Sequence, residues 1–330
     1  MDNNLAVPTP GIRAAVTGST GFIGRHLCAH LTRRGWRVRA ILRPDSSSPA
    51  PEQTEHVVTC LDRSSLTEHL ADCDVVFHLA GLTRAQTLKG FEAANVVAAR
   101  EVALASKLAG ARLIHVSSLA AGGTGTRSTP RTESDTPAPI SPYGRSKLEG
   151  ERAVRSIEHL DWTVIRPPAV YGPGDKDFLT LVQMASRGFF PQIGHPSSAF
   201  SFIYVKDLVR ALDSVARATN TIGEIYYACD ERPYSTSEVS SLLAKVVGRH
   251  YRPVRIPTSL LWLTMAFGFP LNLVGVKPLI TPSRYREITS EGFVCSPEKL
   301  RKTTGFSAKI GLEDGLRRTF DWYTATHAAA

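Results

Sequence analysis

The stretch Thr17-Gly18-Ser19-Thr20-Gly21-Phe22-Ile23-Gly24 decides the fold of this chain of 330 residues. It directly follows the short apolar run Ala14–Thr17 and opens a segment with helical spacing, Phe22–Arg34. A glycine-rich turn between a strand and a helix directs backbone amides and the helix N-terminus toward a phosphate. The stretch therefore predicts a dinucleotide-binding site at the first strand-to-helix turn.

Each glycine of this stretch has its own expected role. Gly18 permits the tight turn, Gly21 lets the backbone approach the pyrophosphate, and Gly24 lets helix and strand pack closely. A purely structural turn is the alternative, but the strand before it and the helix after it favour a cofactor loop. The other residues expected to contact the cofactor here are Thr20, Phe22 and Ile23.

Short β-branched runs alternate with helix-length segments over residues 13–166. The apolar runs are Ala14–Thr17, Val38–Leu42, Val57–Thr59, Val75–Leu79, Leu113–Val116 and Thr163–Ile165. The helical candidates are Phe22–Arg34, which Gly35 would cap, Gly90–Ala109 and Ser141–His159. Strands separated by helices of this length imply parallel pairing with both faces of the sheet covered. We therefore predict an α/β fold, a Rossmann-type doubly wound parallel sheet.

The alternation of strand-like and helix-like segments ends after Pro167, where proline and glycine become frequent and a mostly helical remainder follows. We expect Phe202–Val205 and Ile225–Ala228 to return to the sheet as strands. A smaller, mostly helical substrate-binding lobe should cover the carboxyl edge of the sheet, where ligands bind in such folds. The expected division, in chain order, is a flexible terminus (1–10), the dinucleotide-binding Rossmann domain (11–167), the lobe (168–201), a return to the Rossmann domain (202–230), the lobe again (231–325) and a flexible terminus (326–330).

The composition is that of a globular protein, with 42% hydrophobic and 21% charged residues. The 39 Lys and Arg exceed the 30 Asp and Glu, and 29 of the basic residues are arginines. Guanidinium groups suit anionic ligands because their fork matches phosphate and carboxylate geometry. The chain has no compact basic run and no nucleic-acid motif, so we expect no nucleic-acid partner.

Five cysteines are scattered along the chain and never spaced C-x-x-C, which predicts neither a disulfide framework nor a metal site. We expect them to be small buried hydrophobic residues in a reducing compartment. Residues 1–10 lack the charged and apolar regions of a signal peptide, so we expect a cytoplasmic location.

The apolar stretch Leu260–Val276 is nearly uncharged, but Pro270, Asn272 and two glycines interrupt it. It is short for a membrane span, and the proline would break a helix. We interpret it as helices that wall a substrate pocket, with a peripheral membrane contact through residues 260–276 as the alternative.

The end of the second predicted strand selects the cofactor. NAD-binding proteins usually place Asp or Glu there, whereas NADP-binding proteins prefer Arg. This chain reads Val38-Arg39-Ala40-Ile41-Leu42-Arg43-Pro44, with no acid before Asp45. Arg43, with Arg39 or Arg25 nearby, is therefore expected to bind a 2′-phosphate. NADP(H) is the preferred cofactor, and NAD(H) is the alternative.

Tyr143 and Lys147 are four residues apart and lie on one face of a predicted helix. Near a nicotinamide, the Lys147 ammonium would lower the phenol pKa and let Tyr143 exchange a proton with a hydroxyl or carbonyl group. The strand Leu113–Val116 ends in Ser117 and Ser118, where a serine places a hydroxyl in the ligand crevice. The combination predicts a catalytic site.

These motifs resemble the extended branch of the short-chain dehydrogenase/reductase superfamily, the NAD(P)-dependent epimerase/dehydratase group. The resemblance covers about residues 13–323 and is carried by TGSTGFIG (17–24), HLAG (78–81), ANVVAAREV (94–102), HVSSLAA (115–121), SPYGRSKLEGE (141–151), VIRPPAVYGPGD (164–175), FSFIYVKDL (200–208) and GLEDGLRRTFDWY (311–323). It implies that Tyr143 is the general acid/base and that Lys147 tunes it and holds the nicotinamide ribose. Ser118 would then hydrogen-bond the reacting oxygen, with Ser117 as the alternative serine.

The resemblance implies further contacts with the cofactor. Asn95 matches a family asparagine near the cofactor, or equally a polar residue that supports its helix. The residues expected to line the cofactor are Leu79, Ala80, Gly81, Pro167 and Pro168. Homodimers are common in the family. The apolar positions that would serve a dimer contact, or equally the sheet beneath, are Leu148, Ala153, Val154 and Ile157.

Two departures from the family pattern bear on the substrate. Members that act on nucleotide-diphosphate sugars often carry Asn where this chain has Ala169, and Arg, commonly followed by Asp, where it has Phe200 and Ser201. Phosphates buried against Ala and Phe would lack partners. The arginines that could compensate are Arg127, Arg131, Arg284 and Arg286. The residues expected to face the substrate are Thr83, Ser118, Ala169 and Phe200.

These departures and the apolar stretch favour a less polar alcohol or ketone, as on the 3β-hydroxysteroid dehydrogenase and dihydroflavonol reductase side of the branch. We predict an NADP(H)-preferring oxidoreductase that passes a hydride between nicotinamide and a small-molecule secondary alcohol or ketone, with Tyr143 as acid/base. The alternative is a nucleotide-diphosphate-sugar epimerase or dehydratase with retained NAD. A non-catalytic cofactor-binding protein is the third hypothesis, which the intact set of Ser118, Tyr143 and Lys147 disfavours.

Overall fold

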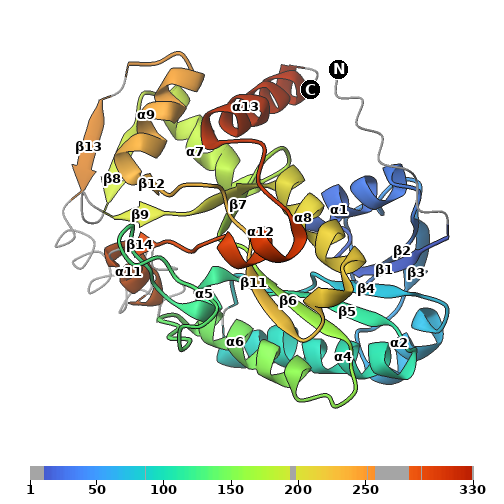
Figure 1. Cartoon of the computed structure of the whole chain (residues 1–330). Coiled ribbons are helices and arrows are strands. Elements are labelled where there is room, and N and C mark those ends of the chain that lie inside the picture. The colour runs from blue at the N-terminus through green and yellow to red at the C-terminus, as the bar shows by residue number, and fades with distance from the viewer. Residues whose placement is uncertain are drawn as a thin grey trace, which may run out of the picture.

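A seven-stranded parallel sheet forms the centre of the protein, seen in a computed structural model that describes residues 11–85, 87–193, 198–250, 252–256, 282–290 and 292–328. Its strands lie in the order β11-β6-β5-β4-β1-β2-β3 (Figure 1). Their bounds are β1 Arg13–Thr17, β2 Arg37–Leu42, β3 Glu55–Val58, β4 Val75–His78, β5 Arg112–Val116, β6 Trp162–Arg166 and β11 Glu224–Tyr227. Every pairing in it is parallel, which confirms the predicted Rossmann-type doubly wound sheet. The strand order reverses between β1 and β4, the point where such sheets bind ligands.

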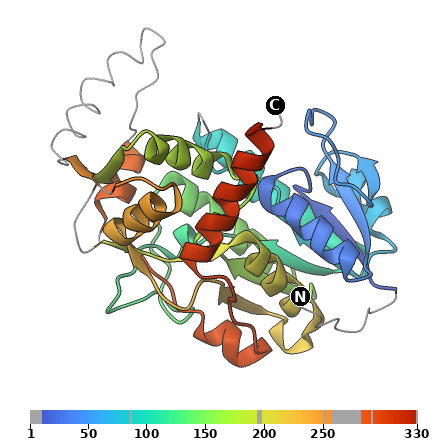
Figure 2. The ribbon, with the colours of Figure 1, turned by 90° about the horizontal axis from the view of Figure 1, so that it is seen from above.

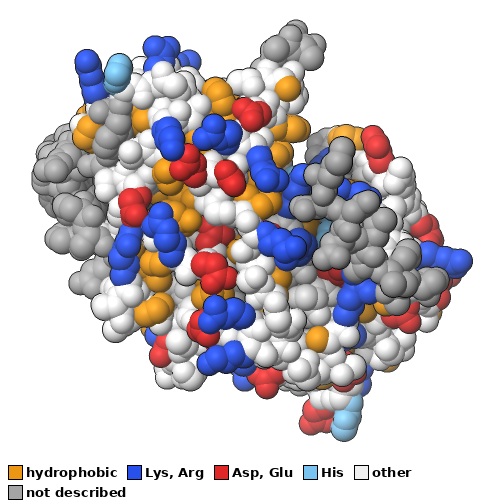
Figure 3. Space-filling view, turned by 45° about the horizontal axis from the view of Figure 1, so that its top comes forward, with side chains coloured by type: hydrophobic (Ala, Val, Ile, Leu, Met, Phe, Trp, Pro, Cys, Tyr) orange, Lys and Arg blue, Asp and Glu red, His pale blue; other side chains and the backbone are white. Residues whose placement is uncertain are grey.

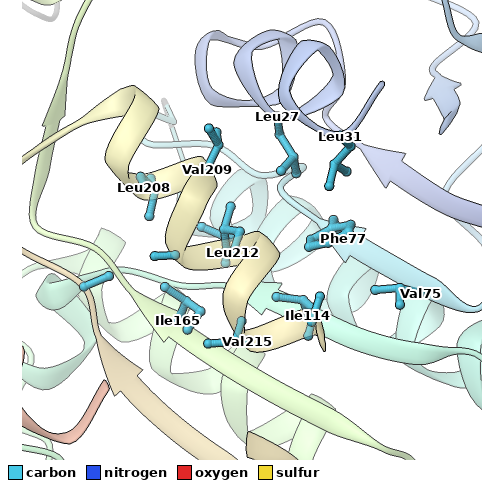
Figure 4. Close-up of a cluster of buried hydrophobic side chains, with 14 of the residues drawn as sticks. Leu27, Leu31, Val75, Phe77, Ile114, Ile165, Leu208, Val209, Leu212 and Val215 are labelled. Carbon is cyan, nitrogen blue, oxygen red and sulfur yellow. The ribbon is translucent and has the colours of Figure 1, made fainter. Parts of the chain in front are cut away.

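Helices cover both faces of this sheet (Figure 1). The helices on one face are α1 (Phe22–Arg33) and α8 (Val205–Arg217), and those on the other are α2 (Arg63–Leu70), α4 (Ala98–Leu108) and α6 (Pro142–Arg155). On the first face, Leu27 and Leu212 point at Phe77 and Ile114 of the sheet (Figure 4). Because the central strands are covered on both faces, apolar residues occupy consecutive positions in them, as in Ala14–Val16 of β1 and Val75–Phe77 of β4.

Most predicted elements of this half are confirmed, and Gly35 takes the expected left-handed conformation after α1, with φ 82°. The predicted helix Gly90–Ala109 is divided into α3 (Leu88–Glu92), a π-helical turn (Ala93–Val97) and α4. Helix α2 was not predicted, because it is short and has only Leu66 and Leu70 as buried residues.

The predicted strand Ile225–Ala228 is confirmed as β11, but the expectation that Phe202–Val205 joins the same sheet is wrong. That segment forms β10 (Phe202–Tyr204) and pairs with β7 (Ala169–Tyr171) in a separate two-stranded sheet. The reason is that β11 occupies the position beside β6, so β10 pairs with β7, the segment that follows β6 in the chain.

The other described elements pack beside the sheet, where Figure 2 shows α7, α9 and α13 grouped together. The remaining elements are α5 (Leu119–Gly122), α7 (Lys176–Ser186), β8 (Phe190–Ile193), β9 (Ala199–Phe200), β12 (Tyr234–Ser235), α9 (Thr236–Val246), β13 (Pro253–Ile256), α11 (Pro282–Thr289), β14 (Gly292–Phe293), α12 (Glu298–Thr304) and α13 (Leu312–Ala328). Several of these elements share a separate hydrophobic core, which includes Tyr171, Tyr204 and Tyr234. This core packs them against the segment that follows β6. The division into domains stays a prediction; the expected terminus 1–10 and the apolar stretch 260–276 lie outside the described residues.

Four cysteines are buried as expected, but Cys60 is exposed, because it lies just after the edge strand β3. Val154 of α6 and Ile157, just after this helix, are buried in the core beneath the sheet, which is one of their two expected roles, and homodimerisation stays a prediction. Basic and acidic side chains alternate over the face drawn in Figure 3. Among the described residues no helix has both the length and the apolar character needed to cross a membrane.

Leu212→Ala should lower the free energy of unfolding by about 2–5 kcal/mol, because it leaves a cavity where α8 meets α1 and the sheet. Denaturant unfolding curves measure this loss. The matched control is Leu108→Ala, whose side chain is 63% exposed at the end of α4 and should cost only about 0.5 kcal/mol. Equal losses in both variants would contradict the assignment of Leu212 to the main core.

Candidate active site

The loop between β1 and α1 is shaped by its glycines. Gly18 has φ 69°, and a Cβ there would lie 2.7 Å from the Ala80 nitrogen. A Cβ on Gly24 would lie 2.1 Å from the Gly18 oxygen, so α1 packs against the loop at a distance that only glycine permits. Gly18 permits the tight turn that the sequence suggested, and Gly24 permits a close approach of α1 to the loop, where close packing of helix and strand was expected.

Gly21 differs, because its Cβ would meet nothing within 4 Å except the Gly18 oxygen at 3.2 Å. It is the N-cap of α1 and no side chain caps that end, nor does the first turn carry an acid. The first backbone amides of α1 are thus left for a ligand, and the loop fits the pyrophosphate of a dinucleotide.

Three arginines were expected near the adenosine end of the cofactor, but two of them have other partners. Arg39 is buried and bonds Glu55 and Asp72, with N–O distances of 2.9 and 2.6 Å. Arg25 donates to the backbone oxygens of Thr20 and Pro49. Arg43 is exposed, and among the described residues its guanidinium forms an ion pair only with Asp45, at 3.6 Å.

Tyr143 lies in the first turn of α6, which begins where Ser141 accepts a hydrogen bond from the Gly144 amide and Pro142 occupies the first helical position. Ser118 follows β5 and caps the short helix α5. Burial raises the pKa of the Tyr143 phenol, a hydrogen bond with Ser118 lowers it, and the negative charge of Glu287 adds to the rise. The structure thus brings the predicted serine and tyrosine into contact.

Lys147 lies one turn further along α6 and is buried. Its Nζ donates to the Val116 oxygen at 2.8 Å. Burial lowers the pKa of this amine to about 8, and the negative charge of Glu151 opposes the shift. Lys147 therefore reaches the end of β5 beside Ser118, with a protonation state that nearby charges can change.

Ser117, the alternative serine, has a different partner, the buried carboxylate of Glu151. Glu151 also accepts from Arg166 at 2.9 and 2.6 Å, and Arg166 donates to the Tyr227 hydroxyl. The geometry favours Ser118 over Ser117 for contact with a reacting oxygen. The sequence analysis missed Glu151 and Arg166; the four-residue spacing of Glu151 from Lys147 was the available signal.

Asn95 supports the backbone around the site. Its amide nitrogen donates to the Leu82 oxygen and to Ser146, both at 2.9 Å, and its oxygen accepts from the Leu82 amide at 2.8 Å. These contacts match the supporting role among its two expected roles. They fix the loop of Leu79, Ala80 and Gly81, while Pro167 lies at the end of β6 and accepts from the Leu119 amide at 2.8 Å.

Two histidines near Lys147 were also missed. His78 hydrogen-bonds the Thr17 hydroxyl at 2.7 Å, and its ring stacks on His115 with 5.3 Å between centroids. Burial, with a smaller contribution from Lys147, lowers the pKa of His78 to about 3 and that of His115 well below its ordinary value. Both imidazoles are therefore neutral, and they add no positive charge near Lys147.

A cavity of about 610 Å³ opens between the loop of residues 124–140 and the end of α11. Its lining residues are Thr124, Gly125, Thr126, Thr129, Pro130, Arg131, Asp135, Ile140, Arg286, Thr289 and Ser290. The expected substrate positions Thr83, Ser118, Ala169 and Phe200 are not among its lining residues: Thr83 and Ala169 are exposed elsewhere, Ser118 caps α5, and Phe200 lies in β9.

The arginines expected to compensate for missing phosphate ligands are partly engaged. Arg127 pairs with Glu238, and Arg131 donates to the backbone oxygens of Gly122 and Thr136. Arg286 lines the cavity, whereas the Arg284 side chain lies outside the described part of the structure.

Sequence and structure comparisons find known proteins that are similar to this chain. The sequence profile of the NAD-dependent epimerase/dehydratase family matches residues 14–229. The chain is 34% identical over 326 residues to a ceramide reductase of Caulobacter vibrioides, with 97% of each chain covered. It is 26% identical to a 4-hydroxy-2-methyl-3-oxo-4-farnesyl-3,4-dihydroquinoline-1-oxide ketoreductase of Stigmatella aurantiaca, over 92% of this chain and 95% of that protein. Among solved structures, MoeE5 in complex with UDP-glucuronic acid and NAD has a TM-score of 0.75 and 25% identity, over 96% of this chain and 100% of that chain.

Glu151→Gln should lower the pKa of Lys147 below its value of about 8, because it removes the negative charge that opposes the effect of burial. Titration of the lysine side-chain carbons by NMR measures this shift. The matched control is Glu149→Gln, on the same helix, where Glu149 is exposed and pairs with Arg152. A Lys147 titration that is unchanged in Glu151→Gln, or shifted equally in the control, would contradict this electrostatic account.

Proposed function

The chain belongs to the NAD-dependent epimerase/dehydratase family, and from that premise we propose that it is an oxidoreductase that reduces a ketone on a lipid-like molecule to a secondary alcohol, with NADPH as the preferred cofactor. The observation that carries this proposal is the contact between Ser118 and Tyr143, with Lys147 one turn away, at the sheet edge that carries the phosphate loop.

The catalytic roles follow from position and chemistry. When bound, the reduced nicotinamide supplies the hydride that goes to the carbonyl carbon. The Tyr143 hydroxyl gives its proton to the carbonyl oxygen, and the Ser118 hydroxyl donates a hydrogen bond to the same atom as negative charge develops there. The Lys147 charge favours the phenolate that remains on Tyr143. Hydride and proton together account for the two hydrogens of the alcohol.

Relatives and site chemistry favour a ketone over a nucleotide sugar. Two relatives that match nearly the whole chain are named as reductases, one for a ceramide and one for a farnesylated quinoline oxide. Ala169 and Phe200 offer no charge to a diphosphate, and Arg127 and Arg131 have partners within the protein. A substrate with a neutral polar part and an apolar part fits these residues better.

The preference for NADPH rests on Arg43. Among Arg25, Arg39 and Arg43, it is the one whose guanidinium makes no hydrogen bond or ion pair shorter than 3.6 Å within the described residues. An exposed guanidinium at this strand end can bind the 2′-phosphate through charge-assisted hydrogen bonds.

Tyr143→Phe should lower the rate of ketone reduction by about a hundredfold or more, because the proton donor is removed. NADPH consumption with a panel of long-chain ketones measures the rate. NADPH affinity, measured by fluorescence, serves as the control and should change little, because the ring can keep its place beside Phe91. Undiminished turnover in this variant would rule out the assigned role of Tyr143.

Arg43→Ala should weaken NADPH binding by about tenfold and NADH binding much less, because it removes charged hydrogen bonds to the 2′-phosphate. The matched control is Arg37→Ala, an exposed arginine at the opposite end of β2. Protein that releases stoichiometric NAD on heat denaturation would instead contradict the NADPH preference and favour the epimerase or dehydratase alternative.

A further inference from the structure

Three segments of the chain meet at the N-terminus of α1, where the glycine loop would hold the pyrophosphate. The first is the glycine loop itself. The second follows β4, and Gly18 packs on it so closely that a Cβ there would lie 2.7 Å from the Ala80 nitrogen. The third comprises residues 172–177, between β7 and the first turn of α7. The phosphate loop thus has a neighbouring segment from each half of the chain.

The segment of residues 172–177 is anchored to two helices. His26 of α1 hydrogen-bonds the Pro173 oxygen at 2.8 Å. A Cβ on Gly174 would lie 3.9 Å from the ring of Phe22, the first residue of α1. At the other end of the segment, the Tyr323 hydroxyl of α13 donates to the backbone oxygen of the α7 N-cap. These contacts fix the segment beside the first turns of α1.

The segment after β4 is fixed at its start and looser beyond it. Asn95 bonds both the amide and the oxygen of Leu82. The backbone groups of the next three residues, 83–85, make no hydrogen bond to other backbone groups within the described chain. Thr83 and Arg84 are also exposed. A short segment with so few internal bonds opens locally at a small cost in free energy.

An ion pair joins this looser segment to the anchored one. Arg84 Nη2 donates to Asp177 Oδ1 at 2.8 Å, and the two side chains are 74% and 72% exposed. Asp177 lies in the first turn of α7, where the helix dipole favours its negative charge. An exposed pair of this kind is weak, so it opens for a sizeable share of the time.

We propose that Arg84 and Asp177 form a latch beside the phosphate loop, and that the dinucleotide cofactor exchanges when this ion pair opens. Residues 83–85 are then the moving part and residues 172–177 the fixed part. The inference rests on the proposed dinucleotide cofactor and adds what sets its rate of exchange. A latch that closes equally over the free and the loaded site slows association and dissociation alike, and it leaves the equilibrium affinity unchanged.

The test removes the ion pair without changing the net charge, in the double variant Arg84→Gln with Asp177→Asn. Stopped-flow fluorescence of NADPH and of NADH measures the association and dissociation rate constants for the full chain. We expect both rate constants to rise about two- to fivefold, the range for loss of an exposed ion pair, while the dissociation constant changes by less than about twofold. The rise should be the same for both nucleotides, because both carry the pyrophosphate.

The matched control is Arg152→Gln with Glu149→Gln, which removes an exposed ion pair within α6 and also keeps the net charge. Its rate constants should equal those of the wild type. Unchanged rate constants in the latch variant, or an equal rise in the control, would overturn the inference while the cofactor assignment stands. Faster dissociation with unchanged association would also overturn it, since that pattern indicates a lost contact with the ligand. A wild-type protein that binds neither nucleotide would overturn the proposed function as well.

Discussion

The buried ion pair of Glu151 and Arg166 is the constraint on which the rest of the site depends. Their side chains are 0% and 2% exposed, so loss of either partner would leave the other charge buried and uncompensated. The pair joins α6 to the end of β6, and Glu151 also holds Ser117 at the end of β5. Since α6 is fixed against two strand ends, Tyr143 and Lys147 have one position relative to the sheet edge where the cofactor loop lies.

The same burial controls the protonation of Lys147. Burial alone would favour the neutral amine of Lys147, and the negative charge of Glu151 restores part of the preference for the ammonium. The stacked imidazoles of His78 and His115 are kept neutral by their own burial, so they fill the space near Lys147 without repelling it. The resulting pKa of about 8 leaves Lys147 responsive to a charged or dipolar ligand placed next to it.

The parts of the fold and site that the sequence could predict are local ones. Gly18 and Gly24 are required by contacts within a single turn, and Tyr143 and Lys147 share a face through helical periodicity. The choice between Ser117 and Ser118 was left open, since neighbouring residues at a strand end point in opposite directions and only the register decides which one meets the crevice. The Glu151–Arg166 pair, the contact of Asn95 with Leu82 and the pairing of β10 with β7 join distant segments. No spacing in the sequence encodes such contacts, so these features could be found only in the structure.

The arginine-rich composition shows why charge must be traced to individual contacts before it can indicate a ligand. Three of the arginines that looked available for anions have partners within the protein: Arg39 pairs with Asp72, Arg127 pairs with Glu238, and Arg131 bonds backbone oxygens. Arg43 and Arg286, which the sequence also linked to a ligand, are exposed instead. Arg43 has Asp45 at 3.6 Å, and Arg286 lines the cavity between the loop of residues 124–140 and α11. Since most of the other arginine charge is used within the protein, the excess of arginine says more about how this fold is held together than about which ligand it binds.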